Sequence, residues 1–393
     1  MKLTKIEIKG LFDLFDYDIP LTNEENLLII TGPNGFGKTM ILNIIDSLFN
    51  NELDFFLKLI FKKIVIDCDN RKQIVIQKKD RYFVILYDNK IFYDYESAQK
   101  EVRVAYEKKN KHSWLSDRTP PHLVDEQFQI NLNKIFDLQV HLIKEQRLLK
   151  IYVSQSYDGE EEESHYTIEE YAKELSILIS EYLQESYSIT QQIDSSFPKR
   201  LLNEKGSLTI EEFDQRFKLL KNKQAKLNRF GLSESEQEIP EYDEQNANVL
   251  LVYLKDSEEK IKVFDSLVNK LELFSNILNE RRFTYKSIKI DRKKGFIFLT
   301  KNGVELSLTD LSSGEQHEVV LLYELIFKTN PNTLVLIDEP EISLHVTWQK
   351  EFLSDLLKIL ELQKMQVIVA THSPQIINER WDLVFNLETQ KIQ

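Results

Sequence analysis

Cysteine is nearly absent from this sequence, which has one Cys among 393 residues. One cysteine excludes an internal disulfide framework and a zinc site built from several cysteines. Long apolar runs are absent too, since no stretch approaches the roughly 20 apolar residues of a membrane span. The first residues, MKLTKIEIKGLFDLFDYDI, alternate apolar and polar side chains and lack the apolar core of a secretory signal. We therefore expect a soluble cytoplasmic protein without a membrane segment.

Positive charge is not in excess either, because 51 Lys and Arg stand against 64 Asp and Glu, for a formal net charge of -13. This balance argues against a surface that binds nucleic acid broadly, although a local basic strip would be compatible with it. Two strips are candidates, and each is more often simply a solvated face. Their members are Lys58, Lys62, Lys63, Arg71, Lys72, Lys78, Lys79 and Arg81, and then Lys108, Lys109, Lys111 and Arg118. Nucleic acid therefore remains open as a partner.

What the chain does have is length and apolar content, 42% of 393 residues, enough for two or more domains. Residues 1–49 read as two strands, a glycine-rich loop and a helix. Residues 60–95 hold short alternating strands with Asp88-Asn89 as a turn signal, which predicts a β-meander inserted after the first helix. Residues 140–153 are typical of a further strand and its exit.

The composition shifts at GEEEESH, residues 159–165, which reads as a charged break. From there to about residue 282 helical periodicity dominates. An apolar seam with heptad-like spacing consists of Leu254, Ile261, Phe264, Val268, Leu271 and Leu278. A shorter helix ends at Phe230-Gly231. The insertion is either a pair of antiparallel, coiled-coil-like arms with a short third helix, or a helical subdomain packed on the core.

Strands return after residue 283, and continuous apolar runs such as TLVLI and VIVA are typical of buried parallel strands. Alternation of these runs with helices predicts an α/β fold with a nucleotide-binding core. We therefore divide the chain into residues 1–158, the first part of the core, residues 159–282, the helical insertion, and residues 283–393, the second part of the core.

The loop GPNGFGKT, residues 32–39, has the spacing of a P-loop and lies between an apolar strand and an apolar-periodic helix. Asn34, Gly35 and Gly37 would bring backbone N–H groups around a β-phosphate. Lys38 would reach the β- and γ-phosphates, and the Thr39 hydroxyl would ligate Mg²⁺. The loop therefore predicts ATP and Mg²⁺ as ligands, with a chance glycine-rich turn as the alternative.

Two carboxylates, Asp338 and Glu339, directly follow the run TLVLI and so arrive at the carboxyl edge of a buried strand, where ligands bind in such sheets. Asp338 suits the outer coordination sphere of the metal, and Glu339 suits the general base that activates a water toward the γ-phosphate. His372 follows the run VIVA in the same way, and its imidazole can donate to the γ-phosphate. The alternatives are an acidic surface turn and a structural histidine.

The segment LSSGEQHE, residues 311–318, begins a helix with polar residues ahead of the apolar stretch VVLLYELIF. Free N–H groups and the helix dipole make such an N-terminus an anion site. Ser312 would add a hydroxyl there, and Gly314 would allow a close backbone approach. An ordinary N-cap with Glu315 as capping-box partner is the alternative.

The P-loop, LSSGE, VLIDEPEISLH and ATHSP, in this order and with a long insertion between the first two, resemble an ABC-class ATPase head of the SMC, RecF and OLD type. The resemblance implies that Gln146, in LIKEQRLL, is the Q-loop glutamine that senses metal and γ-phosphate. It implies that Ser312 and Gly314 contact the γ-phosphate held by the P-loop of another copy, so that two chains sandwich two ATP molecules. Ser343 and His345 would form the D-loop.

The sequence departs from the ABC consensus at Ser313, where a glycine is usual, and at His345, where transporters and SMC heads usually carry Asp. The form EPEISLH is similar instead to RecF-like and OLD-like proteins. It is also similar to ATPases of bacterial anti-phage systems such as PtuA of Septu and AriA of PARIS.

This resemblance implies an ATPase that works as sensor or regulatory subunit of an anti-phage defence complex, as a homodimer or higher even oligomer. A separate effector, a nuclease or toxin, is expected because no HNH arrangement, Cys/His cluster or TOPRIM-like tail is found, and Asp67-Cys68-Asp69 reads as a turn. One alternative is a DNA repair or recombination ATPase similar to RecF and SMC. Another is a scaffold that binds ATP with negligible turnover. A transporter subunit fits least.

Overall fold

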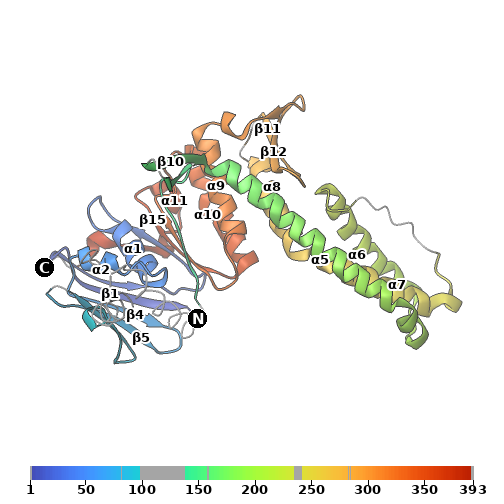
Figure 1. Cartoon of the computed structure of the whole chain (residues 1–393), viewed down its shortest axis with the longest axis horizontal. Coiled ribbons are helices and arrows are strands. Elements are labelled where there is room, and N and C mark those ends of the chain that lie inside the picture. Colours follow the sequence, from blue (N-terminus) through green and yellow to red (C-terminus); the bar gives the residue numbers. More distant parts are fainter. Residues whose placement is uncertain are drawn as a thin grey trace. The chain divides into compact units, whose positions relative to one another are not determined.

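The computed structural model describes residues 2–80, 82–97, 138–156, 159–233, 241–281, 283 and 285–390. The chain forms two compact units, Met1–Gln146 with Lys328–Gln393, and Arg147–Phe327 (Figure 1). These units divide the chain after Gln146 and after Phe327, whereas the sequence pattern suggested divisions after residues 158 and 282. The difference arises because residues that flank the helical insertion cluster with its helices.

An antiparallel sheet of the first unit contains the expected β-meander. Its strand order is β2-β1-β4-β5-β6-β7, so that the meander extends the N-terminal hairpin. The strands are β1 Leu3–Leu11, β2 Phe15–Pro20, β4 Lys63–Cys68, β5 Gln73–Lys78, β6 Phe83–Tyr87 and β7 Lys90–Asp94. Asp88 and Asn89 turn β6 into β7 with φ values of 51° and 62°, the left-handed pair of a two-residue hairpin turn. The predicted meander is therefore confirmed.

A parallel sheet in the same unit has the order β16-β3-β15-β14-β8. Its strands are β3 Leu27–Thr31, β8 Val140–Ile143, β14 Leu334–Asp338, β15 Gln366–Ala370 and β16 Val384–Asn386. Every residue of β14 and β15 is buried, which explains why both strands read as continuous apolar runs. Because the strands are parallel, the segments that follow them meet at one edge of the sheet.

Helices of the first unit are α1 Lys38–Phe49, α2 Asp54–Lys58, α10 Val346–Gln363 and α11 Pro374–Ile377. Helix α1 packs against β8, β14 and β15 and buries Ile41, Ile44 and Leu48. These side chains belong to an apolar core that also contains residues of both sheets. The packing holds the start of α1, and with it the P-loop, at the edge of the parallel sheet.

In the second unit, the acidic segment GEEEESH is a strand and not the break that we expected. It belongs to β10 Gly159–Tyr166, which pairs residue by residue with β9 Leu149–Ser156. A strand is possible here because the hairpin ladder is made by backbone groups, and β-propensity depends strongly on context. Sequence composition alone could not show that pairing.

The helices of the insertion are α5 Thr167–Asn203, α6 Ile210–Arg229, α7 Ala247–Lys262 and α8 Asp265–Arg281. Helix α7 packs against α5 and α6. The predicted apolar seam is buried along its whole length, and it continues from α7 into α8 across Phe264. Ion pairs Arg216–Glu258 (2.6 Å) and Lys223–Asp265 (2.6 Å) join α6 to these helices. The helices of the insertion therefore pack on one another.

A hairpin and the helix that follows it complete the second unit, with β11 Lys286–Asp291, β12 Gly295–Thr300, β13 Glu305–Leu306 and α9 Ser313–Phe327. Gly295 (φ 77°) lies so close to α5 that a Cβ would come within 1.8 Å of the Ala172 carbonyl oxygen. Tyr171 of α5 stacks on Tyr323 of α9 and donates a hydrogen bond to Glu324 (2.6 Å). Glycine and the tyrosine pair thus fix α5 against β12 and α9.

Short 3-10 turns complete the described structure at Glu244–Asn246, Leu308–Asp310, Trp381–Leu383 and Leu387–Thr389. Among the helices that the structure describes, none combines the length and apolar character needed to cross a membrane.

Candidate functional site

The P-loop joins β3 to α1 and has the backbone that its glycines permit. Gly35 and Gly37 have φ values of 87° and 82°, in the left-handed region that favours glycine. Gly37 is the N-cap of α1, so no side chain there competes for the first N–H groups of the helix. Unsatisfied N–H groups at a helix N-terminus bind anions, and phosphate is the usual one in such a loop.

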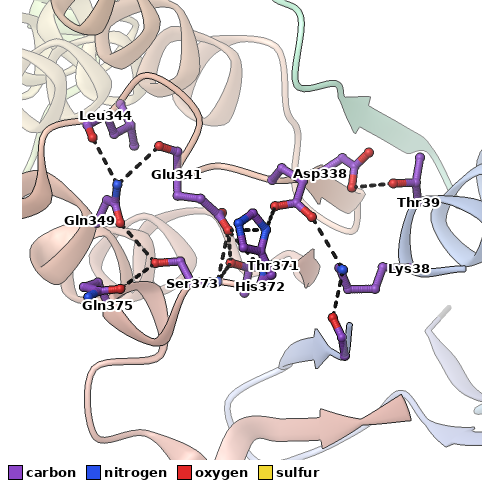
Figure 2. Close-up of polar contacts among 12 residues, drawn as sticks. Lys38, Thr39, Asp338, Glu341, Leu344, Gln349, Thr371, His372, Ser373 and Gln375 are labelled. Atoms are coloured by element: carbon purple, nitrogen blue, oxygen red, sulfur yellow. Dashed lines mark hydrogen bonds and ion pairs between the residues drawn. The ribbon is translucent and has the colours of Figure 1, made fainter. Parts of the chain in front are cut away.

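Lys38 and Thr39 connect the P-loop to the end of β14. The buried Lys38 side chain donates from Nζ to the Gly32 carbonyl oxygen (2.9 Å), and Nζ lies 3.7 Å from Glu339 Oε1. The Thr39 hydroxyl donates to Asp338 Oδ1 (3.1 Å), as Figure 2 shows. The structure therefore brings together the two motifs that the sequence placed at one sheet edge.

Asp338 and Glu339 are buried enough for their ionisation to change. Burial raises the pKa of the Asp338 carboxyl, the Thr39 hydrogen bond opposes this, and the charge of Glu145 adds to it. Burial also raises the pKa of Glu339, and neighbouring Glu341 raises it further, while His372 lowers it. Both carboxylates would be stabilised as anions by a cation placed beside them.

The arrangement of Thr39 and Asp338 fits Mg²⁺. This ion prefers oxygen ligands, and the Thr39 hydroxyl and an Asp338 carboxylate oxygen lie 3.1 Å apart at the mouth of the P-loop. A second group, Glu339, Glu341 and His372, has ligand atoms within 4.8 Å of one another among the described residues. Within this second group, Glu339 also contacts Lys38 and His372.

His372 follows β15 and reaches the same edge of the sheet. Its Nδ1 contacts Glu339 Oε2 and lies 3.3 Å from Glu341 Oε1 (Figure 2). The His372 side chain is 55% exposed, so it faces open space on its other side. A histidine that is held by two carboxylates and remains accessible is suited to contact a ligand.

Glu341 is a residue of this site that our sequence reasoning missed. It is 7% exposed, and its Oε1 accepts hydrogen bonds from Thr371 Oγ1 (2.6 Å), His372 N (3.1 Å) and Ser373 N (3.1 Å). The available signal was a third acidic residue in DEPE, inside a turn that directly follows a buried strand. Its partners, however, lie 30 to 32 positions further along the chain, so the sequence does not show that they meet.

The structure gives the positions of Gln146, Ser343 and His345, and their expected roles stay predictions. Gln146 is exposed and lies shortly after β8, the strand that pairs with β14. Ser343 has a left-handed φ of 64°. The exposed His345 is the N-cap of α10, where its Nδ1 accepts from Thr347 N (3.3 Å). His345 thus has a local structural function at the position where Asp is usual.

In the second unit, Ser312 and Glu315 form a capping box at the start of α9. Glu315 N donates to Ser312 Oγ (3.3 Å), and Ser312 N donates to Glu315 Oε2 (2.8 Å). Lys286 binds the same Glu315 carboxylate at 2.7 Å. The ordinary N-cap that we kept as an alternative is therefore present. The contact of Ser312 and Gly314 with a phosphate on another copy stays a prediction.

The first basic strip is only partly available on the surface. Lys78 donates to the carbonyl oxygens of Phe56 (2.5 Å), Leu57 (2.8 Å) and Leu59 (3.1 Å) and so satisfies the end of α2. Lys72 lies over the Tyr87 ring, 5.2 Å from its centroid. Arg81 and the whole second strip lie outside the described residues. Lys78 is therefore not available as a free surface charge.

Comparison with known proteins identifies relatives of this chain. It is 28% identical over 156 residues to "Retron Ec83 probable ATPase" of Escherichia coli, a match that covers 34% of this chain and 28% of that protein. It is 32% identical over 117 residues to "Protein ea59" of Escherichia phage lambda, covering 29% of this chain and 22% of that protein. The chain thus matches less than a third of the length of either relative.

Solved structures of SMC heads also align with the chain, with TM-scores below 0.5. The Pyrococcus furiosus Smc head domain with an extended coiled coil, bound to the C-terminal domain of ScpA, has a TM-score of 0.45 at 14% identity, covering 98% of this chain and 92% of that one. The Thermotoga maritima SMC head domain has a TM-score of 0.40 at 14% identity, with coverages of 98% and 94%.

A family model, described as AAA ATPase domain, matches residues 1–377 and so covers nearly the whole chain. Together with the P-loop, the DEPE turn and the histidine that meet at one sheet edge, this match settles the family. The protein belongs to the AAA ATPase domain family.

Proposed function

We propose that this protein binds ATP with Mg²⁺, hydrolyses it to ADP and phosphate, and uses the cycle as sensor or regulatory subunit of a bacterial anti-phage defence complex. The observation that carries the enzymatic part is the meeting of Lys38, Thr39 and Asp338 with Glu339 and His372. These residues come from segments that follow three different parallel strands.

In the proposed reaction the P-loop N–H groups and Lys38 bind the β- and γ-phosphates. Thr39 would ligate the Mg²⁺, Asp338 would support it from the outer coordination sphere, and Gln146 would sense it. When bound, the ion would neutralise phosphate charge. Glu339 accepts a proton from the water that attacks the γ-phosphorus, and the bond to the β-phosphate oxygen breaks. His372 donates to the γ-phosphate. Burial and Glu341 raise the pKa of Glu339, and the contact with His372 offsets part of this shift.

A contact between one copy of the chain and the ATP held by another, called the trans contact, would make ATP a link between two copies. We propose that Ser312 and Gly314 of one copy bind the γ-phosphate held by the P-loop of a second, so that a homodimer or higher even oligomer closes on ATP and loosens after hydrolysis. The capping box leaves this open, because Ser312 Oγ accepts in the box and its hydroxyl proton can still donate.

The defence role and the separate effector rest on the relative described as a retron ATPase and on the absence of nuclease motifs in the sequence. A cytoplasmic location would give the protein access to ATP. The net charge of -13 favours a protein effector over a DNA clamp. A repair or recombination ATPase, and a scaffold with negligible turnover, are the competing functions. A turnover assay tests the scaffold, and recovery of the protein with its partners tests the repair function.

The test compares the native protein with Glu339→Gln, which keeps the side-chain volume but removes the base. We expect Mg²⁺-dependent ATP turnover in the native protein, its loss in the variant, and an ATP-stabilised dimer of the variant by light scattering. Parental turnover in Glu339→Gln would refute the assignment of the base. No turnover in the native protein would favour the scaffold.

The Glu339→Gln protein, tagged in its native host and recovered with ATP and Mg²⁺, then identifies the partner by mass spectrometry. A nuclease or toxin-like protein that the native ATPase cycle releases supports the defence complex. Recovery of DNA with recombination proteins alone would assign the protein to repair.

A further inference from the structure

Glu341 links two loops of the site that are far apart in sequence. One is the turn after β14, residues 339–345, and the other is residues 371–373 after β15. The Glu341 side chain lies between them, and Figure 2 shows its hydrogen bonds reaching Thr371, His372 and Ser373. The second loop carries His372, and the first carries Glu339.

A single carboxylate oxygen makes all of these contacts. Glu341 Oε1 accepts from the Thr371 hydroxyl and from two successive backbone N–H groups, and it lies 3.3 Å from His372 Nδ1. The other oxygen, Oε2, is buried and has no hydrogen-bond partner among the described residues. Burying a carboxylate is costly, and convergent charged hydrogen bonds are what offset that cost. The contacts therefore depend on an acceptor at this position.

Gln349 of α10 adds a second connection between the same loops. Its Nε2 donates to the carbonyl oxygens of Leu344 (3.0 Å) and Glu341 (3.4 Å), and its Oε1 accepts from the Ser373 hydroxyl (3.0 Å). The turn after β14 and residues 371–373 are thus tied at two points. In contrast, the His372 side chain is 55% exposed and has little packing to hold it.

We infer that Glu341 is a positioning residue for ATP hydrolysis, which holds residues 371–373 against the turn after β14 so that His372 and Glu339 keep their relative placement. The inference rests on the proposed hydrolysis. Glu341 acts through His372 and does not itself contact the nucleotide. A displacement of about 1 Å in a catalytic group can reduce a rate on the order of 100-fold, so an anchor of this kind has a measurable effect.

The experiment uses the full chain and compares Glu341→Ala, which removes the acceptor, with Glu341→Gln, whose amide oxygen can accept the same hydrogen bonds. Glu361→Ala, an exposed change on α10, is the matched control. For each protein we would measure kcat, nucleotide affinity, the melting temperature, and hydrogen exchange of the backbone amides of residues 371–373. Because exchange needs no turnover, the anchor can be tested separately from hydrolysis.

We expect Glu341→Ala to lower kcat roughly 10- to 100-fold with nucleotide affinity within about twofold of the native value. Exchange at residues 371–373 should rise in that variant, whereas Glu341→Gln should stay close to the native protein in both measurements. Thr371→Val removes one of the donors to Glu341 and should lower kcat less than Glu341→Ala does. This variant tests the same anchor if Glu341→Ala does not fold.

Several outcomes would overturn the inference. If the backbone amides of residues 371–373 exchange in Glu341→Ala as slowly as in the native protein, these residues need no anchor. If kcat, nucleotide affinity and melting temperature all fall in Glu341→Ala, the residue has a role in folding alone. If Glu341→Gln is as impaired as Glu341→Ala, the negative charge of Glu341 matters and its hydrogen bonds do not. If the native protein hydrolyses no ATP while exchange still rises in Glu341→Ala, the proposed function fails and the anchor stands without a catalytic role.

Discussion

The Thr39 hydroxyl donates a hydrogen bond to Asp338 Oδ1 across 3.1 Å, although 299 positions separate the two residues. One belongs to the first turn of α1 and the other ends β14. In the proposed site the Thr39 hydroxyl would ligate Mg²⁺, and the Asp338 carboxylate would support it from the outer coordination sphere.

Removing Mg²⁺ or changing Asp338 should therefore affect the same step. We expect EDTA to abolish turnover, and Asp338→Asn to raise the Mg²⁺ concentration for half-maximal turnover roughly 10- to 100-fold, since loss of a supporting carboxylate weakens metal binding by that much. Turnover measured against Mg²⁺ concentration checks this, with Asp69→Asn in an exposed turn as the control. An unchanged Mg²⁺ requirement in Asp338→Asn would contradict the assignment.

Lys38→Ala should weaken ATP binding at least about 100-fold, equivalent to about 3 kcal/mol. The side chain is buried beside Glu339 and is the one cation within 4 Å of that carboxylate among the described lysines and arginines. Titration with a fluorescent ATP analogue measures the affinity. Lys58→Ala, an exposed change on α2, should bind as the native protein does. Near-normal affinity in Lys38→Ala would reject the P-loop assignment.

Ser312→Arg should reduce turnover on the order of 100-fold, because a large cation would block the phosphate contact from the second copy and a lost donor there is costly. Binding of ATP to the single chain should persist. Ser180→Arg, the same substitution at an exposed position of α5, is the control. If turnover of Ser312→Arg matched that of Ser180→Arg, the proposed contact with the second copy would be wrong.

His317 should make the second unit less stable in mild acid. Burial, together with the smaller effect of the Arg147 charge, lowers the pKa of the imidazole from 6.5 to about 4. The unfolded chain therefore protonates His317 more readily than the folded chain does. The contribution of His317 to the free energy of unfolding is complete above about pH 6.5, and it falls by about 1 kcal/mol per pH unit as the pH drops toward 4. Urea unfolding of the native protein and His317→Phe at pH 7.5 and 5.0 measures it.

In this comparison the native protein should lose more stability between the two pH values than His317→Phe does. Equal losses in the two proteins would mean that the imidazole stays charged in the folded state or is accessible to water.

Gly295→Ala should destabilise the second unit by about 3 kcal/mol, through overpacking and a positive φ. The new methyl group would meet the Ala172 carbonyl oxygen at 1.8 Å. Gly303→Ala is a close control, because its φ of 78° is the same within a degree but a Cβ there has nothing within 4 Å. Thermal unfolding should show a clearly lower midpoint for Gly295→Ala than for Gly303→Ala. Similar midpoints would mean that α5 can move away.

Much of the fold and of the site could be predicted because the relevant signals are local. Continuous apolar runs identified β3, β14 and β15, since strands of a covered parallel sheet bury both faces. Residues that directly follow such runs had to meet at one edge, which is why Lys38, Asp338, Glu339 and His372 were found together. The glycine spacing of the P-loop likewise specified its backbone conformation.

Other features could not be predicted, because they depend on which segments lie opposite each other. The acidic strand β10 forms only because β9 offers it a complete backbone ladder. Lys78 looked like part of a surface strip, yet it satisfies the carbonyl groups at the end of α2. In both cases a tertiary partner outweighs what composition suggests.

The sequence by itself therefore determined the chemical groups of this ATPase and the strand ends that present them, since periodicity and spacing act over a few residues. Only the tertiary structure decided that Glu341 ties residues 371–373 to the turn after β14, and that Thr39 faces Asp338. Those relations are hydrogen bonds between segments brought together by the parallel sheet. A hydrogen bond has a direction and a range of about 3 Å, so it is decided by the packed position of both partners.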